Sequence, residues 1–192
     1  PPLIHFILNT ATSQLPSLAR RAVDLIEQLS TQRSGYSPSV LVIGTIVDAA
    51  CKHDIASAFT LAKRLVGLAA SLSVTLNQQV FNTLISALCR RGEVEQASAV
   101  YTYMCGAGIQ PDEYTFHLLM TGWAGIGNVA RATELSKTMS NMNIQPNVTT
   151  YTTLLTAHCN CKDMSSALRV LDEMRAAGIQ PNEVTYAALV TG

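Results

Sequence analysis

Residues 108–112 read Gly-Ile-Gln-Pro-Asp, residues 143–147 read Asn-Ile-Gln-Pro-Asn and residues 178–182 read Gly-Ile-Gln-Pro-Asn, so one phrase returns every 35 residues. Two apolar series keep the same step: Ala97, Ala132 and Ala167, and Met104, Met139 and Met174. A single globular core requires no such register, whereas a stack of similar units does, because each unit buries its apolar face on the next. The sequence therefore predicts a solenoid, and function is expected on a shared surface rather than in one catalytic pocket.

Each unit carries two apolar stripes at helical spacing. In residues 78–112 these are Phe81, Leu84, Ile85 and Leu88, followed by Val94, Ala97, Tyr101 and Met104. Gly92 separates the stripes, Gly108 follows the second one, and Pro111 cannot continue a helix. Asp112 then stands where it can cap the next helix. The pattern predicts an all-α fold in which every unit is a helix, a tight turn and a second helix.

The register divides the chain into units of unequal regularity. We expect repeats at 78–112, 113–147 and 148–182, and the first helix of a truncated repeat at 183–192. The register is looser over 1–77, which is predicted to hold two degenerate repeats that could cap the stack. Because the chain stops partway through a repeat, we expect it to be an internal piece of a longer protein.

Composition and charge exclude several classes of protein. The chain is 48% hydrophobic and 14% charged, with a net charge of zero, so it is not predicted to be disordered. Residues 1–91 sum to +4 and residues 92–192 to −4, whereas a protein that binds duplex DNA through its phosphates is usually strongly basic. No apolar run reaches the ~20 residues of a membrane span, and no targeting peptide is recognisable, so no membrane association is expected.

No catalytic or metal site is expected from the side chains with reactive groups. The five cysteines are an odd number, and Cys89 and Cys159 share one position of the repeat, which is typical of a small core residue. His158, Cys159 and Cys161 are close in sequence, but one short helix cannot direct all three toward one ion. With no nucleophile and base set in view, we expect no enzyme activity, no cofactor and no small-molecule substrate.

Three phrases carry a resemblance to a known family. They are Val148-Thr149-Thr150-Tyr151-Thr152-Thr153-Leu154, Leu88-Cys89-Arg90-Arg91-Gly92 and Gly178-Ile179-Gln180-Pro181-Asn182. The chain resembles the pentatricopeptide repeat family over 78–192 and less closely upstream, while the rival tetratricopeptide repeat has a period of ~34 residues and another Trp, Gly and Tyr pattern. The resemblance implies a right-handed α-solenoid with first helices on its concave side. It also implies single-stranded RNA binding in a mitochondrion or chloroplast, in support of RNA processing, stability or translation.

The resemblance also implies site residues. In the family, the residue after the first-helix aromatic and the last residue of the unit read one base together. The pairs here are Asn82 with Asp112, His117 with Asn147, and Thr152 with Asn182. The first resembles a uracil reader and the third an adenine reader, while the second has no assigned base, so the predicted core target is 5′-U-N-A-3′.

Base clamping and phosphate contacts depart from the family pattern. The clamping positions hold Gln79, Tyr114, Thr149 and Val184, of which Tyr114 and Val184 suit the role. Arg90 matches a phosphate-contacting position, whereas Gly125 and Asn160 replace the corresponding cations. RNA binding is therefore expected to be weak for this segment alone. The alternative is a scaffold that docks protein partners in an organellar complex, which the neutral charge and the missing cations favour.

Overall fold

The structure is a computed structural model that describes residues 24, 64, 67 and 77–191. The degenerate repeats predicted over 1–77 lie outside the described residues, except for Asp24, Arg64, Gly67 and Asn77. Arg64 and Asp24 form an ion pair of 2.8 Å, which joins positions 40 residues apart in the chain.

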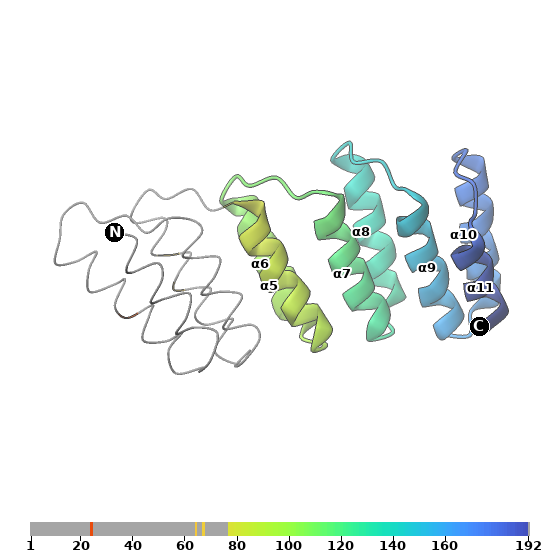
Figure 1. The fold of residues 1–192 in the computed structure, drawn as a ribbon, viewed down its shortest axis with the longest axis horizontal. Helices are drawn as coiled ribbons and strands as arrows, with labels where there is room; N and C mark the ends of the chain where they lie inside the picture. Colours follow the sequence, from red (N-terminus) through yellow and green to blue (C-terminus); the bar gives the residue numbers. More distant parts are fainter. Residues whose placement is uncertain (1–23, 25–63, 65–66, 68–76, 192) are drawn as a thin grey trace.

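Within residues 77–191 every regular element is a helix, and the helices stand side by side in chain order along the long axis of the molecule (Figure 1). They are α5 (Gln78–Arg90), α6 (Val94–Gly106), α7 (Glu113–Gly125), α8 (Val129–Asn141), α9 (Val148–Asn160), α10 (Met164–Ala176) and α11 (Glu183–Thr191). The first helix of each unit begins 35 residues after the previous one, at Gln78, Glu113, Val148 and Glu183. The predicted all-α repeat solenoid is confirmed.

Short polar side chains start the helices. Asn77, Asp112 and Asn147 accept a hydrogen bond from the backbone N–H three residues on, which satisfies one of the unpaired donors of the first turn. At Asp112 and Asn147 the third residue of the helix is a threonine that returns the bond, which completes a capping box. The predicted capping role of Asp112 is confirmed.

Left-handed residues end the helices. The positive φ angles belong to Gly92, Gly127 and Lys162 after the first helices and to Gly108, Asn143 and Gly178 after the second helices. Backbone bonds close each end, as where Glu93 N–H donates to Leu88 O at 3.0 Å and Ile109 N–H donates to Met104 O at 3.1 Å. Lys162 is unusual here, because its side chain disfavours a φ of 61°.

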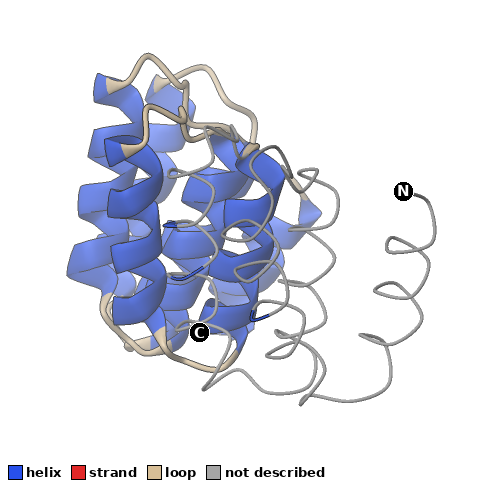
Figure 2. Ribbon diagram, turned by 90° about the vertical axis from the view of Figure 1, so that its left-hand side faces the viewer, coloured by secondary structure: helices blue, strands red, loops and turns tan. Residues whose placement is uncertain are grey.

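The helices form two layers, which we call the first-helix layer (α5, α7, α9 and α11) and the second-helix layer (α6, α8 and α10). Consecutive first helices pack on one another more extensively than consecutive second helices do, so the first-helix layer is the inner side of the stack. In Figure 2 the axes of the described helices have similar orientations, and the described loops lie at the two ends of the helices.

The recurring small and apolar residues form the contact between layers. Ala97, Ala132 and Ala167 are each 0% exposed, so all three lie in the interior of the stack. Met104, Met139 and Met174 are also buried, in agreement with a packing role. Other residues on the helices are only half-buried, among them Tyr101, Val129, Leu135, Tyr151, His158 and Met164.

Candidate nucleic-acid interface

Two hollows open on the first-helix layer and contain most of the predicted site residues. The upstream hollow, of about 540 Å³, is lined by α5 and the start of α7, and it includes Asn82, Arg90, Asp112 and Tyr114. The downstream hollow, of about 440 Å³, is lined by α7, α9 and the start of α11. It includes His117, Thr152, Asn182 and Val184. Asn147 is the one predicted site residue that lines neither of these two hollows.

Asn82 and Asp112 are brought together by hydrogen bonds across the unit boundary. Asn82 Nδ2 donates to Asp112 Oδ1 at 3.3 Å, although the two residues are 30 positions apart. The Thr115 hydroxyl lies 2.7 Å from Asn82 Oδ1 and 2.8 Å from Asp112 Oδ1. Asn82 is only 7% exposed, so its amide is held in place and presents little more than its edge to the hollow.

Hydrogen bonding keeps the carboxylate of Asp112 charged. Burial by itself would raise the pKa of Asp112, but bonds from the backbone and side chain of Thr115 and from Asn82 outweigh it. The pKa of Asp112 therefore lies below its ordinary value of 3.8. The upstream hollow consequently holds a fixed acceptor with a negative charge near neutral pH.

Thr152 and Asn182 are connected through a third residue rather than directly. The hydroxyls of Thr152 and Thr185 lie 2.9 Å apart, and Thr185 Oγ1 donates to Asn182 Oδ1 at 2.9 Å. The backbone N–H of Thr185 donates to the same oxygen at 2.9 Å. The structure thus joins the predicted pair into one network that is centred on Thr185, which is 0% exposed.

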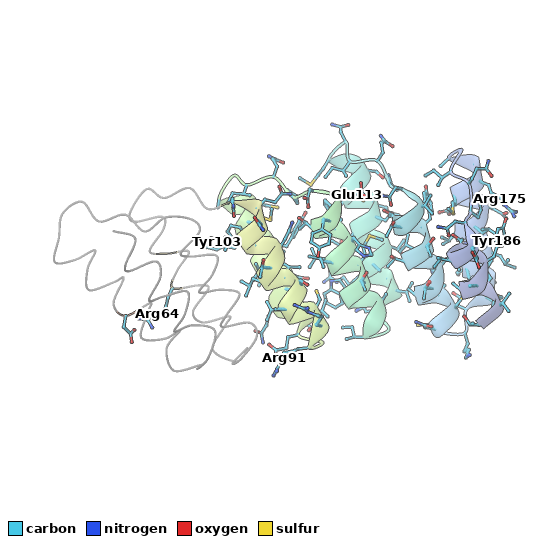
Figure 3. The ribbon with its side chains drawn as sticks, viewed as in Figure 1. Arg64, Arg91, Tyr103, Glu113, Arg175 and Tyr186 are labelled. Atoms are coloured by element: carbon cyan, nitrogen blue, oxygen red, sulfur yellow. The ribbon has the colours of Figure 1, made fainter. Side chains whose placement is uncertain are left out.

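His117 and Asn147 are not joined in this way. Asn147 Oδ1 accepts from the backbone N–H of Thr150 at 3.0 Å, and Asn147 Nδ2 donates to Glu113 Oε1. Glu113 lies at the start of α7, where Figure 3 labels it. Nδ1 of His117 is buried and has no hydrogen-bond partner among the described residues. The amide of Asn147 is therefore engaged by a carboxylate while His117 is left unsatisfied.

A buried threonine in each unit is the part of the site that the sequence interpretation missed. Thr115, Thr150 and Thr185 are 0%, 4% and 0% exposed, and all three contact the last residue of the preceding unit. Their 35-residue step was a usable signal, as was the Asp/Asn-x-x-Thr spacing that is typical of a capping box. A buried hydroxyl needs hydrogen-bond partners, and those partners are the predicted base-reading residues.

The surroundings of the hollows are poor in positive charge. Tyr114 and Val184 are 53% and 62% exposed, as a stacking or clamping side chain needs to be. Arg90 is the one cation among the residues that line the upstream hollow, and the downstream hollow has no Lys or Arg in its lining. Any phosphate backbone along this face would therefore have few cationic partners in residues 77–191.

The described residues contain no group of three or more His, Cys, Asp or Glu side chains placed to hold a metal ion. None of their helices has the length and apolar character required to cross a membrane.

Comparison with known proteins finds likenesses in sequence and in structure. The family model described as the pentacotripeptide-repeat region of PRORP matches residues 30–191. A pentatricopeptide repeat-containing protein of Arabidopsis thaliana is 31% identical over 115 residues, which are 58% of this chain and 17% of that protein. The pentatricopeptide repeat protein PPR10 from maize superposes with a TM-score of 0.78 at 26% identity, over 96% of this chain and 26% of that one.

Several of the solved structures similar to this chain contain RNA. PPR10 in complex with an 18-nt psaJ RNA element gives a TM-score of 0.65 at 25% identity, over 91% of this chain and 26% of that one. The PPR domain of protein-only RNase P 1 from Arabidopsis thaliana, in complex with tRNA, gives 0.67 at 15% identity over 98% and 96% of the two chains. At that identity the second likeness concerns the fold alone. The chain spans about a quarter of PPR10 and less than a fifth of the Arabidopsis thaliana pentatricopeptide repeat-containing protein.

Proposed function

This chain belongs to the pentatricopeptide repeat family, and from that premise we propose that its first-helix layer binds single-stranded RNA and reads bases one unit at a time. The observation that carries the proposal is the placement of Asn82 with Asp112 and of Thr152 with Asn182 in successive hollows of one surface. Each pair is held by partly buried hydrogen bonds and retains polar groups for a base edge. The likeness to PPR10, which has been solved in complex with an RNA element, supports RNA binding by this chain.

The proposed recognition is short and depends little on charge. With Asn82/Asp112 as a uracil reader, Thr152/Asn182 as an adenine reader and no base for His117/Asn147, the proposed core remains 5′-U-N-A-3′. Tyr114 and Val184 would stack on or clamp neighbouring bases, and Arg90 would contact a phosphate. Because the hollows have a single cation, affinity should be low and should fall only slightly with added salt.

The engagement of Asn147 by Glu113 supports a base-tolerant middle position. An amide that is already bonded to a carboxylate has less capacity to select a base, and His117 contributes no paired group beside it. We therefore assign the middle nucleotide no preference.

In the cell we propose an organellar role, in a mitochondrion or chloroplast, in which the chain supports the processing, stability or translation of a transcript. The proposed role is binding, with no chemical step assigned to the chain.

Fluorescence anisotropy of the chain with short RNAs tests the proposal. RNA that carries U-N-A should bind more tightly than a scrambled RNA, and Asn82→Ala or Thr152→Ala should remove that difference. Thr138→Ala is the matched control for Thr152→Ala, because Thr138 lies on α8, and its hydroxyl bonds only the carbonyl of Glu134 at 2.9 Å. Circular dichroism checks that each variant is folded. Equal affinity for all RNAs, or no binding at low salt, would refute base reading by this segment.

A second candidate is a docking surface for a protein partner. It is favoured by the exposed aromatic side chain of Tyr114 on the first-helix layer, which is 53% exposed, together with the scarcity of cations in the lining of the two hollows. Figure 3 labels Tyr186 beside Arg175 at the C-terminal end of the described chain, and Arg175 donates to Tyr186 Oη at 3.3 Å. If the chain does not bind RNA but captures an organellar protein, and Tyr114→Asp abolishes that capture, this candidate is favoured over the first.

A further inference from the structure

We infer that the buried threonines Thr115 and Thr185 are positioning residues, which set the hydrogen-bonding groups that units 78–112 and 148–182 present to a base. This positioning role rests on the proposed function and deepens it, because it adds a third residue to each base-reading pair. Both threonines are 0% exposed, so neither can touch RNA itself. Their influence would pass entirely through the side chains that they bond.

Thr115 fixes the amide of Asn82 in one orientation. Asp112 Oδ1 already accepts from the backbone N–H of Thr115 at 2.8 Å and from Asn82 Nδ2 at 3.3 Å. The single hydroxyl hydrogen of Thr115 is thus shared between two acceptors, Asp112 Oδ1 at 2.8 Å and Asn82 Oδ1 at 2.7 Å, and it is the one donor that the described residues offer to Asn82 Oδ1. The reverse amide orientation would set two acceptors against each other at the carboxylate. What remains for a base is one N–H of Asn82 as donor and Oδ2 of Asp112 as acceptor.

In unit 148–182, Thr185 reverses the order of donor and acceptor in the base-reading pair. Its hydroxyl and its backbone N–H both donate to Asn182 Oδ1, each at 2.9 Å. Since that hydroxyl hydrogen is used, the 2.9 Å contact between the Thr152 and Thr185 oxygens takes its hydrogen from Thr152. Thr152 is then left with lone pairs only, and Asn182 is left with two Nδ2 hydrogens. The first-helix member of this pair is an acceptor and the last residue is a donor.

Opposite polarities select opposite classes of base. On the Watson–Crick edge, uracil and guanine place a carbonyl beside a ring N–H, whereas adenine and cytosine place an amino group beside a ring acceptor. If the base takes the same position in both units, unit 78–112 accepts a base with a carbonyl beside a ring N–H. Unit 148–182 then accepts a base with an amino group beside a ring acceptor. This agrees with uracil for Asn82/Asp112 and adenine for Thr152/Asn182, and it attributes the difference to the direction of two buried hydroxyls.

Unit 113–147 provides the matched control within the chain. Thr150 is also buried and caps α9, and its hydroxyl lies 3.2 Å from Asn147 Oδ1. The hydrogen bonds of residues 77–191 do not link it to His117, which occupies the position of Asn82 and Thr152. Removal of the Thr150 hydroxyl should therefore cost as much capping energy as removal of the Thr115 hydroxyl, without turning any base-reading group.

The experiment is anisotropy of the 192-residue chain with RNAs in which the nucleotide read by unit 78–112 is varied. Thr115→Val should narrow the preference for U over C at that nucleotide by about three- to tenfold, as expected for one hydrogen bond, and leave the preference for A in unit 148–182 unchanged. Thr115→Ser should retain the wild-type ratio. Thr185→Val should act on the preference for A alone, and Thr150→Val should change neither while it lowers the thermal midpoint.

Several results would overturn the positioning role. An unchanged U-to-C ratio in Thr115→Val that still binds RNA would overturn it and leave the proposed function intact. An equal loss of preference in Thr150→Val would reduce the threonines to structural caps. Wild-type protein without any base preference would overturn both the positioning role and the proposed function. If Thr115→Val does not fold, the same comparison is made with Thr185→Val, where an unchanged preference for A is the refuting result.

Discussion

Substitution of Gly122 by alanine should destabilise the contact between α5 and α7. Gly122 is buried near the C-terminal end of α7, and a Cβ at this position would lie 2.7 Å from Cys89 Sγ. It would also lie 3.1 Å from Cys89 Cβ and 3.2 Å from Val94 Cγ1, both of which are closer than ordinary van der Waals contact. Three atoms of two residues must therefore move, and one of them, Cβ of Cys89, is attached directly to the backbone of α5.

The expected size follows from two opposing effects. Replacing glycine by alanine inside a helix contributes about 1 kcal/mol of stability, because glycine loses more backbone freedom on folding. Overpacking a well-filled contact costs roughly 1–3 kcal/mol. Cys89 has a single side-chain torsion with which to move its sulfur away, so we expect the cost to lie in the upper part of that range. The net loss should be about 1–2 kcal/mol, or roughly 2–8 °C in the thermal midpoint.

Thermal unfolding followed by circular dichroism measures this loss, and two variants identify its cause. Gly125→Ala is the matched control, since Gly125 is exposed at the end of α7 with nothing within 4 Å of an added Cβ, and it should be neutral or stabilising. In a Cys89→Ala background the 2.7 Å conflict is absent, so Gly122→Ala should cost less there, with a coupling of about 1–2 kcal/mol. Burial raises the pKa of Cys89 to about 11, so the thiol is neutral in an unfolding experiment near neutral pH.

A Gly122→Ala variant as stable as the wild-type protein would refute the packing argument. So would equal losses with and without the sulfur of Cys89, because the cost would then arise from something other than this contact.

Three other outcomes are expected from the same structure. Lys162→Gly should stabilise the chain by about 0.5–1 kcal/mol in a thermal melt, since Lys162 has a φ of 61° where the aligned turns use Gly92 and Gly127; a destabilised variant would contradict this reasoning. Ser98→Ala should lower stability by about 1 kcal/mol, because Trp123 Nε1–H donates to Ser98 Oγ at 3.2 Å, and the fluorescence of this single tryptophan would report the transition; an unchanged midpoint would show that the bond contributes nothing. Hydrogen bonds from the side chain and backbone of Ser166, and then from Ser165, lower the pKa of Asp163 to about 2, so this carboxylate stabilises the fold above its ordinary value of 3.8 and that contribution disappears as the pH falls toward 2. The unfolding midpoints of wild type and Asp163→Asn should therefore converge over that range, and a constant difference would contradict the assignment.

Much of the fold could be predicted because its rules are local and are repeated. A stripe of Phe81, Leu84, Ile85 and Leu88 indicates a helix whatever lies around it, and all four residues are buried. Proline and glycine mark the ends, and Asn143 was recognisable as the other residue that accepts a left-handed backbone. Lys162 adopts the same backbone without any such preference, because the hydrogen-bonded turn in which it stands is fixed by the helices on either side.

The members of the candidate site could be selected only by resemblance, and their contacts could not be predicted. Asn82 and Asp112 are 30 positions apart, and whether they bond depends on how one unit rests on the next. The sequence presents His117/Asn147 as a pair equivalent to the other two. The structure instead engages Asn147 with Glu113 and leaves Nδ1 of His117 without a partner among the described residues. A register shows which positions are equivalent, but side-chain orientation depends on neighbours that differ between units.

The sequence by itself determined the period, the helices, their caps and the small residues at which the layers meet, because each follows from backbone preferences and apolar spacing within one unit. Only the tertiary structure decided that Thr115 and Thr185 link each last residue to a first-helix partner, and that the close approach of α5 and α7 requires Gly122. The physical reason is that hydrogen bonds and van der Waals contacts act over a few ångströms, and those distances are set by packing between units rather than by the order of residues within them.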